Sequence, residues 1–334
     1  NSSNLACRHC WITPLLVDGQ PDPGDVINLD ALRAAVHEAK PLGLGSAKLT
    51  GGEPLLHPRF VAIIDMLTEE GLCLNMETNG TLLTADLARY LRNETNLAFV
   101  SVSIDGADAE THDAFRRREG AFDAALRGLD HLVAAGFENT QVIMCAHNAN
   151  RHQVAAVVRL AAEHGAASVK INPVTSSGRG VGMHERGEGL NFYERMALAR
   201  HIYDELRPTL REDSLSLGLV LNTPLALMPI GEMMRRRGQA GDCGVRSILG
   251  MLGSGEIALC GIGRTVPELV YGRLGQDSIR NVWLNHPTIL ELRRVLDDVD
   301  SFPGICGECT MANKCRTGCV AQNFVDGRQL VWPD

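Results

Sequence analysis

The sequence predicts an α/β fold, a partial (β/α)6 TIM-like barrel followed by a small cysteine-rich domain. Between Leu29 and about Leu206, strand-like and helix-like patterns alternate, which is typical of parallel strands joined by helical crossovers. After Leu206 the alternation is lost, and Pro, Gly and Cys punctuate short segments. We therefore predict a barrel domain over residues 1–212 and a second domain over residues 213–334.

The predicted elements follow one another in a regular order. Leu32, Val36 and Ala39 recur at helical spacing, with Asp30 placed to cap their helix. Strands are predicted at residues 47–50, 73–78, 98–103, 141–146 and 168–172, and further helices at residues 60–70, 84–91, 122–135, 154–164 and 192–206. A strand running into the Cys7 region would complete six units. The chemistry of such barrels lies at the carboxyl ends of the strands.

The bulk composition indicates a folded protein and excludes some partners. Hydrophobic residues make up 45% of the chain and charged residues 22%, close to the average for globular domains. The net charge of -8 lacks the basic excess of nucleic-acid binding proteins. We see no apolar run of membrane-spanning length and no signal-peptide pattern. We expect a cytoplasmic protein with neither nucleic acid nor membrane as a partner.

The ten cysteines favour metal ligation. Disulfides are rare in the reducing cytosol, and a chain of this length does not need them. Cys73 and Cys145 fall in apolar strand-like runs and are predicted to be small buried hydrophobes. The other eight are candidate metal ligands: Cys7, Cys10, Cys243, Cys260, Cys306, Cys309, Cys315 and Cys319.

Two motifs lie at the ends of the first two predicted strands. The first is Cys7-Arg8-His9-Cys10, and the second is Thr50-Gly51-Gly52-Glu53-Pro54. Their order and spacing resemble the radical S-adenosylmethionine (radical SAM) superfamily, whose signature is C-x3-C-x2-C followed by a GGEP-type turn. The resemblance implies a 4Fe-4S cluster held by three thiolates, whose open iron binds S-adenosylmethionine.

The resemblance also implies cofactor-binding roles at successive strand ends. Gly51 and Gly52 would let the backbone approach the methionine amino group, since glycine has no Cβ. Glu53 would anchor the same end, and His9 would lie near the adenine. The predicted cofactor-binding residues are His9, Gly51, Gly52, Glu53, Pro54, Asn79, Ser103 and Arg116. Asn79-Gly80 and Asp105-Gly106 are equally typical of ordinary turns.

The sequence departs from the family pattern at its first cysteine. That position, four residues before Cys7, is Ser3. A serine hydroxyl is a poorer ligand for cluster iron than a thiolate. An engineered substitution, a displaced chain start and a natural loss of activity remain open. The chain begins where the first strand should end, so we expect residues to precede Asn1.

The second domain resembles the SPASM extension of peptide-modifying and protein-modifying radical SAM enzymes. Its cysteines form C-x2-C-x5-C-x3-C at residues 306–319, and C-x11-G-x4-C at residues 243–260. The resemblance implies one or two auxiliary iron-sulfur clusters. Cys306, Cys309 and Cys315 would bind one, and Cys243, Cys260 and Cys319 the other. A downstream cysteine that normally completes the first is missing before Asp334, so either the tail is lost or that cluster is incomplete. Structural zinc is the alternative for these thiols.

By resemblance, the chain cleaves S-adenosylmethionine to a 5'-deoxyadenosyl radical, which abstracts a hydrogen from substrate. A flavodoxin-like or ferredoxin-like donor would supply the electron. Auxiliary clusters would make the reaction oxidative, and a ribosomally made peptide or small protein is the predicted substrate. Tetrapyrrole or other cofactor biosynthesis is one alternative. Sulfatase maturation is another, although Gly261 stands where those enzymes carry an acidic residue. With Ser3 in place of a ligand, a non-catalytic cluster-bearing binding partner is a third.

Overall fold

The structure, a computed structural model, describes residues 3–12, 16–17, 20–21, 26–213, 215, 217–235, 243–261 and 265–327. The chain divides into two compact units, neither of which is continuous in sequence. Unit 1 comprises residues 1–24, 45–174 and 182–222, and unit 2 comprises residues 25–44, 175–181 and 223–334. The backbone therefore passes from one unit to the other several times.

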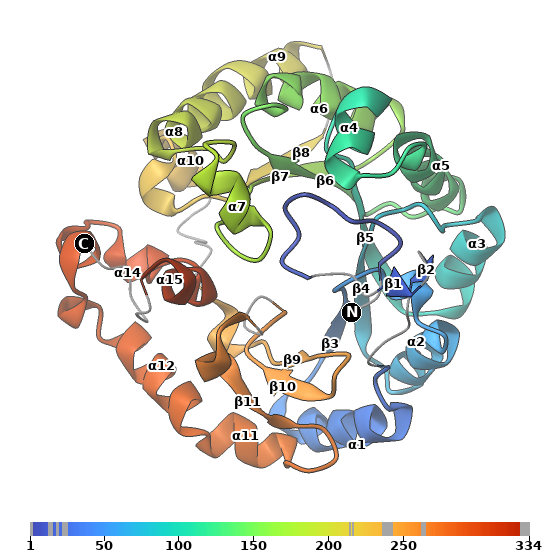
Figure 1. Ribbon diagram of the computed structural model, residues 1–334, viewed down its shortest axis with the longest axis vertical. Coiled ribbons are helices and arrows are strands. Elements are labelled where there is room, and N and C mark those ends of the chain that lie inside the picture. The colour runs from blue at the N-terminus through green and yellow to red at the C-terminus, as the bar shows by residue number, and fades with distance from the viewer. Residues whose placement is uncertain are drawn as a thin grey trace. The chain divides into compact units, whose positions relative to one another are not determined.

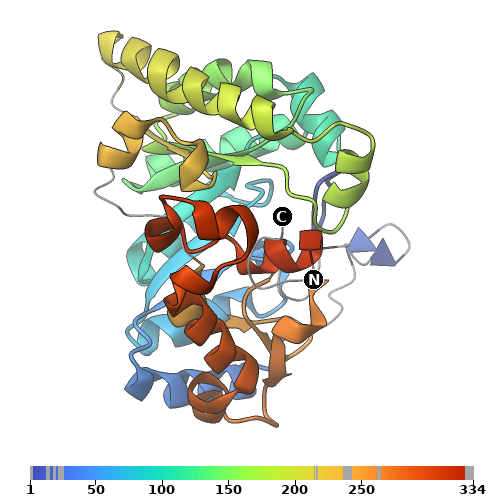
Figure 2. The same cartoon turned by 90° about the vertical axis from the view of Figure 1, so that its left-hand side faces the viewer.

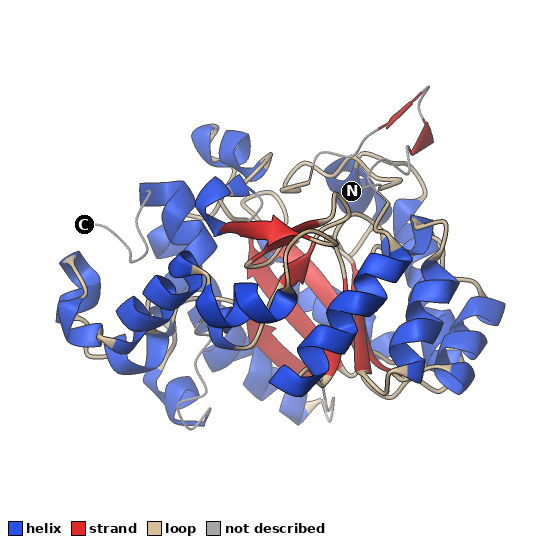
Figure 3. Cartoon of the chain, turned by 90° about the horizontal axis from the view of Figure 1, so that it is seen from below, coloured by secondary structure: helices blue, strands red, loops and turns tan. Residues whose placement is uncertain are grey.

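Unit 1 is built on a six-stranded parallel sheet. The strands follow in sequence order: β3 (Ser46–Leu49), β4 (Cys73–Thr78), β5 (Leu97–Ser103), β6 (Thr140–Ala146), β7 (Ser168–Pro173) and β8 (Gly218–Leu221). Each pairs in parallel with the next, and β3 and β8 form the two edges. Figure 1 shows helices on the outside of the curved row of strands, and Figure 3 shows the same strands in red among blue helices. This arrangement confirms the predicted α/β partial barrel.

The two faces of this sheet differ in chemistry because successive side chains of a strand point to opposite faces. One face is aliphatic and fully buried, as expected where helices cover a parallel sheet; it includes Leu74, Met76, Val100, Val102, Val142, Met144, Val169 and Ile171. The residues that alternate with these are mostly polar, including Asn75, Glu77, Ser101, Gln141, Lys170 and Asn172. The inner face of the strands is therefore a polar surface.

The helices of unit 1 lie close to their predicted positions. They are α2 (Phe60–Glu69), α3 (Ala85–Glu94), α4 (Ala109–Arg116), α5 (Ala121–Ala134), α6 (Val154–Glu163), α8 (Phe192–Arg200) and α9 (Arg207–Glu212). A π-helical segment, His201–Leu206, joins α8 to α9, and Figure 2 shows the three as one continuous rod. Helix α4 was not predicted; the Asp108 side chain caps it by accepting a hydrogen bond from the Thr111 amide.

The strand composition of the sheet differs from the prediction at both ends. Residues 3–12, where a first strand was predicted to run into Cys7, contain no strand. The sixth strand is instead β8, which follows Asp213 and pairs with β7. Four residues, Gly-Leu-Val-Leu, are too few to show the alternation by which a strand is recognised in sequence.

Unit 2 combines helices with a three-stranded antiparallel sheet. Its strands are β9 (Gly250–Met251), β10 (Glu256–Ala258) and β11 (Val270–Arg273). Its helices include α1 (Leu29–Ala39), α10 (Ile230–Arg235), α11 (Ile279–Asn285), α12 (Pro287–Asp297), α13 (Gly304–Glu308), α14 (Ala312–Cys315) and α15 (Val320–Gly327). Asn28, not Asp30 as predicted, caps α1 by accepting from the Ala31 amide at 2.9 Å. Asp30 lies inside the first turn, where its charge favours the helix dipole.

Several short elements complete the description. They are β1 (Leu16–Val17), β2 (Gln20–Pro21), α7 (Gly180–Glu185) and the 3-10 helices η1 (Lys40–Leu42), η2 (Pro54–Leu56), η3 (Arg151–Gln153), η5 (Leu225–Leu227), η6 (Gly244–Arg246), η8 (Pro267–Leu269) and η9 (Val299–Ser301). Among the helices in the described ranges, none is long and apolar enough to cross a membrane.

A close contact between two glycines fixes α5 against the turn after β4. A Cβ at Gly128 would lie 2.2 Å from the Gly80 carbonyl oxygen. Gly128→Ala should therefore lower the free energy of unfolding by about 1–3 kcal/mol, as over-packing does, measured by urea unfolding. Gly45→Ala is the matched control, since a Cβ there meets nothing within 4 Å, and it should change stability by less than about 0.5 kcal/mol. Equal stability of the two variants would contradict the contact.

Candidate functional site

The cysteine-bearing segment 3–12 is bound to the carboxyl end of β4 through Asn4. The Asn79 side-chain amide donates to Asn4 Oδ1 at 2.8 Å, and the Asn4 amide donates to Thr81 Oγ1 at 2.9 Å. Arg118 adds a hydrogen bond to the Asn4 carbonyl oxygen at 3.2 Å. The segment therefore lies at the strand ends, where the chemistry of a barrel is expected. The sequence analysis did not identify Asn4.

The GGEP turn is attached to the same strand end by Glu53. This carboxylate is buried, and it accepts hydrogen bonds from Thr78 Oγ1 at 2.6 Å and from the Asn79 amide at 2.7 Å. The Leu55 amide donates to it at 3.3 Å. Burial raises the pKa of Glu53, and the hydrogen bonds only partly oppose this. Glu53 thus fixes the position of the turn.

The two glycines of the turn have backbones that other residues rarely adopt. Gly51 has φ 86° and Gly52 has φ 63°, both left-handed. A Cβ at Gly51 would lie 3.7 Å from Ile12 Cδ1, so the turn also approaches the segment that follows Cys10. Pro54 opens the 3-10 helix η2, of which Glu53 is the N-cap. The structure therefore brings the two sequence motifs together.

Cys7 and Cys10 pack beside each other at this place. Cys7 is buried, Cys10 is half-buried, and both lie against Leu5 and Ala121. Ser3, at the position of the missing cysteine, accepts a hydrogen bond at its Oγ from the Leu5 amide at 3.2 Å. The described residues of this motif therefore offer two thiols and one hydroxyl.

A buried ion pair supports Cys7. Arg116 Nε lies 2.5 Å from Asp105 Oδ2, with both side chains almost fully buried, and Arg116 Nη1 lies 3.6 Å from Cys7 Sγ. Burial disfavours the charged form of both side chains. Even so, Arg116 holds the pKa of Asp105 below its ordinary value, and Asp105 and Cys7 raise the pKa of Arg116. Arg116 is thus a fixed cation beside Cys7. From the sequence, Asp105 was predicted only to be part of an ordinary turn.

His9 lies in an aromatic stack. The centroid of its ring lies 4.6 Å from that of Phe115, and the angle between the two ring planes is 6°. The Phe115 centroid lies 4.4 Å from that of His147, with an interplanar angle of 18°. Burial lowers the pKa of His147, and burial together with Arg116 lowers the pKa of His112 to about 4. Ser103 is half-exposed at the end of β5.

In unit 2, Cys243 interacts with two other predicted ligand cysteines. The Cys243 thiol interacts electrostatically with Cys260 and Cys319, and burial raises its pKa to about 11. Tyr271 is 6% exposed, and its hydroxyl is buried without a hydrogen-bond partner among the described residues, although it interacts electrostatically with Cys243 and Cys260. A buried hydroxyl of this kind normally has a partner. An iron-sulfur cluster on these cysteines would supply sulfur as the acceptor, so the residues fit such a group.

The other three cysteines of unit 2 lie on and between α13 and α14. The Cys309 amide donates to the Cys306 carbonyl at 3.4 Å, and the Met311 amide donates to Cys309 Sγ at 3.4 Å. Cys315 ends α14. In the part of the chain that the structure describes, no group of three or more Cys, His, Asp or Glu residues is arranged to hold a metal ion.

The two remaining cysteines were predicted to be buried. The residue Cys145 is half-buried as a whole, but its thiol is buried, and this burial raises the pKa of the thiol. Cys73 is exposed, which corrects the prediction. As the first residue of β4, it lies at the amino end of the strand, on the face opposite the buried Leu74 and Met76. Apolar neighbours in sequence do not bury a residue at a strand end.

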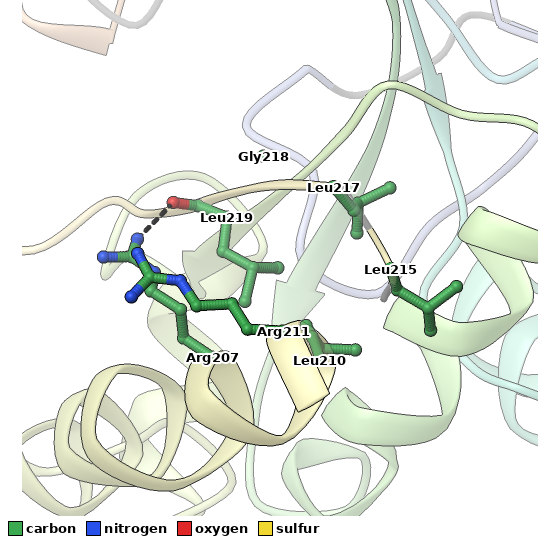
Figure 4. A pocket seen from close by; sticks show the side chains of 7 residues that line it. All are labelled: Arg207, Leu210, Arg211, Leu215, Leu217, Gly218 and Leu219. Atoms are coloured by element: carbon green, nitrogen blue, oxygen red, sulfur yellow. Dashed lines mark hydrogen bonds between the residues drawn. The ribbon is translucent and has the colours of Figure 1, made fainter. Parts of the chain in front are cut away.

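A pocket near β8 lies away from the site. Arg207, Arg211, Gly218 and Leu219 are among its lining residues, and Arg207 donates to the Leu219 carbonyl oxygen at 3.0 Å (Figure 4). Gly218 is the first residue of β8, so the pocket lies at the amino end of that strand. The motifs lie at the carboxyl ends of the parallel strands, which is the opposite end of the sheet along the strand direction.

The chain is similar in sequence to known proteins. Residues 2–161 match the Radical SAM superfamily model, and this range includes both sequence motifs. Mycofactocin maturase MftC of Mycobacterium tuberculosis is 28% identical, covering 99% of this chain and 79% of that protein. The AdoMet-dependent heme synthase of Methanosarcina barkeri is 29% identical, covering 96% of this chain and 89% of that protein.

Solved structures share the fold. Streptococcus suis SuiB bound to S-adenosylmethionine has a TM-score of 0.75 at 14% identity, covering 100% of this chain and 74% of SuiB. Native anSMEcpe with bound AdoMet has a TM-score of 0.72 at 15% identity, covering 96% of this chain and 86% of that chain. At this identity the likeness shows the fold alone.

Proposed function

We propose that this protein is a radical SAM enzyme that oxidatively modifies a ribosomally made peptide. The observation that carries the proposal is the meeting of the Cys7–Cys10 segment and the GGEP turn at Asn79, which bonds to both Asn4 and Glu53. The match to the Radical SAM superfamily model and the maturase relatives support it. When bound, the cluster supplies the electron that cleaves S-adenosylmethionine to a 5'-deoxyadenosyl radical.

The residues of unit 1 would then act by binding and orientation. Cys7 and Cys10 would be cluster ligands, and the left-handed backbones of Gly51 and Gly52 would face the methionine end of S-adenosylmethionine. Since both Glu53 oxygens already accept hydrogen bonds within the chain, we propose that Glu53 also positions this turn. His9, Pro54, Asn79 and Ser103 remain proposed cofactor contacts. Arg116, which pairs with Asp105, would act chiefly on the Cys7 thiolate.

We further propose that the predicted second domain, residues 213–334, is a SPASM-type domain with auxiliary clusters, apart from its β8 segment, which belongs to the barrel sheet. The grouping of Cys243, Cys260 and Cys319, and the unpartnered Tyr271 hydroxyl, support one of them. Cys306, Cys309 and Cys315 would serve a second. Iron and sulfide analysis of anaerobically reconstituted protein separates this proposal from structural zinc, for which zinc without sulfide would be found.

The test uses reconstituted protein, S-adenosylmethionine, a flavodoxin-like or ferredoxin-like electron donor, and a short peptide encoded beside its gene. We expect 5'-deoxyadenosine to form and the peptide to lose mass in step with it. Cleavage of S-adenosylmethionine with unchanged peptide mass would count against a peptide substrate.

The heme synthase relatives support tetrapyrrole modification as a second candidate, because their identity and coverage match those of the maturases. A tetrapyrrole carrying propionate side chains would be the probe for this activity. Turnover of that probe, with the peptide unchanged, would favour the second candidate over the first.

A further inference from the structure

Two side chains on the inner face of β7 are not used by the proposed cofactor chemistry. Lys170 and Asn172 are two residues apart on this strand, so they point to the same face, opposite the fully buried Ile171. In the register with β6, Lys170 pairs with Ile143 and Asn172 with Cys145.

Lys170 is a half-buried ammonium group with no hydrogen bond to any of the described residues. The carboxylate that attracts Lys170 electrostatically is Glu77, across the inner face. Glu77 already accepts hydrogen bonds from Lys48 Nζ and from Thr50 Oγ1. Two lysines therefore share one carboxylate, and burial together with Lys48 lowers the pKa of Lys170. An added anion would relieve this excess of positive charge.

Asn172, on the same face of β7, has a side-chain acceptor that lacks a donor among the described residues. Its Oδ1 atom is buried and accepts no hydrogen bond within the described ranges, and such acceptors normally have a donor. The adjacent Cys145 thiol interacts electrostatically with Lys170 and with Cys7 and Cys10. This pair of side chains therefore lies near the cysteine segment.

We propose that Lys170 and Asn172 bind a carboxylate of the substrate, with Lys170 pairing with the carboxylate and Asn172 Oδ1 accepting a neighbouring N–H. A peptide offers this combination at its carboxyl terminus or beside an acidic side chain. The inference rests on the proposed peptide function. It assigns these residues to substrate anchoring, close to the segment where the radical would form.

The lysine content of the chain makes the site directly observable. Only four lysines occur, at positions 40, 48, 170 and 314. Reductive methylation with 13C-formaldehyde keeps their charge and gives each an NMR signal, assigned with Lys→Arg variants. The probes are acetate against acetamide, and an N-acetylated pentapeptide with a free carboxyl terminus against the same peptide amidated.

We expect acetate and the free-acid peptide to shift the Lys170 signal saturably, and acetamide, like the amidated peptide, to leave it in place. The Lys314 signal is the internal control and should not move. Asn172→Ala should weaken peptide binding about tenfold, the effect of losing one hydrogen bond. Circular dichroism of each variant verifies that it is folded.

Two results would overturn the assignment. One is a Lys170 signal that no carboxylate shifts. The other is a Lys170 signal that S-adenosylmethionine alone shifts and that added peptide then no longer changes. That result would assign the site to the methionine carboxylate of the cofactor. Cleavage of S-adenosylmethionine is measured on the same samples. If cleavage and peptide modification persist without a Lys170 response, this inference fails and the proposed function stands.

Discussion

Replacing Ser3 by cysteine is expected to restore cluster binding and cleavage of S-adenosylmethionine. Ser3 lies on the same segment as Cys7 and Cys10, and its Oγ now accepts a hydrogen bond from the Leu5 amide. A thiolate is a far better iron ligand than a hydroxyl. Since loss of even an outer-shell partner costs about 10- to 100-fold in metal affinity or activity, the gain should be about 100-fold or more. Iron content and 5'-deoxyadenosine formation measure it.

The matched control for this substitution is Ser3→Ala, which removes the hydroxyl without adding a ligand. It should leave cleavage at the level of the unchanged chain. If Ser3→Cys is as inactive as Ser3→Ala while binding the same amount of iron, a non-catalytic binding partner becomes the better interpretation. The Ser3 result therefore separates enzyme from binding protein.

Removing the cation beside Cys7 should destabilise unit 1 strongly. Arg116→Leu leaves the fully buried Asp105 carboxylate unpaired, and breaking a buried pair in this way costs about 3–5 kcal/mol. Urea unfolding at neutral pH measures the loss. Arg89→Leu breaks the exposed pair between Arg89 and Asp86 and should change stability by less than about 1 kcal/mol.

The pH dependence of the same pair follows from the direction of its pKa shift. Burial acts to raise the pKa of Asp105, but Arg116 and neighbouring groups hold it below its ordinary value. The pair therefore stabilises the fold at neutral pH, and this contribution is lost as the pH falls through the depressed pKa. Arg116→Leu should weaken this loss of stability in acid. An unchanged acid profile in Arg116→Leu would assign the acid sensitivity to other groups.

Much of the barrel was predictable because its strands and helices carry strong local patterns. Residues 73–78 form β4 as predicted, and the helix predicted at 154–164 is α6 to within one residue. The missed elements are weakly patterned. β8 has four residues, and α4 carries Ala, Glu, Thr, His and Asp before its buried Phe115. Pairing with β7 and capping by Asp108 hold these elements in place.

The site was predictable as motifs but not as contacts. Cysteine spacing and the GGEP turn singled out Cys7, Cys10 and Gly51 because grouped thiols and glycine turns leave a sequence pattern. The partners of Glu53 and Arg116 could not be found in this way, since Thr78 and Asp105 reach them only after the sheet has formed. Long-range hydrogen bonds leave no spacing signal in one sequence.

The discontinuous make-up of unit 2 affects how the chain can fold during synthesis. Helix α1 packs with α11, and Ser278 donates a hydrogen bond to Glu38, 240 residues earlier, at 2.7 Å. Contacts between such distant residues slow folding. The apolar face of α1 therefore leaves the ribosome long before its partner exists, and a nascent chain that stops before residue 279 should depend on chaperones.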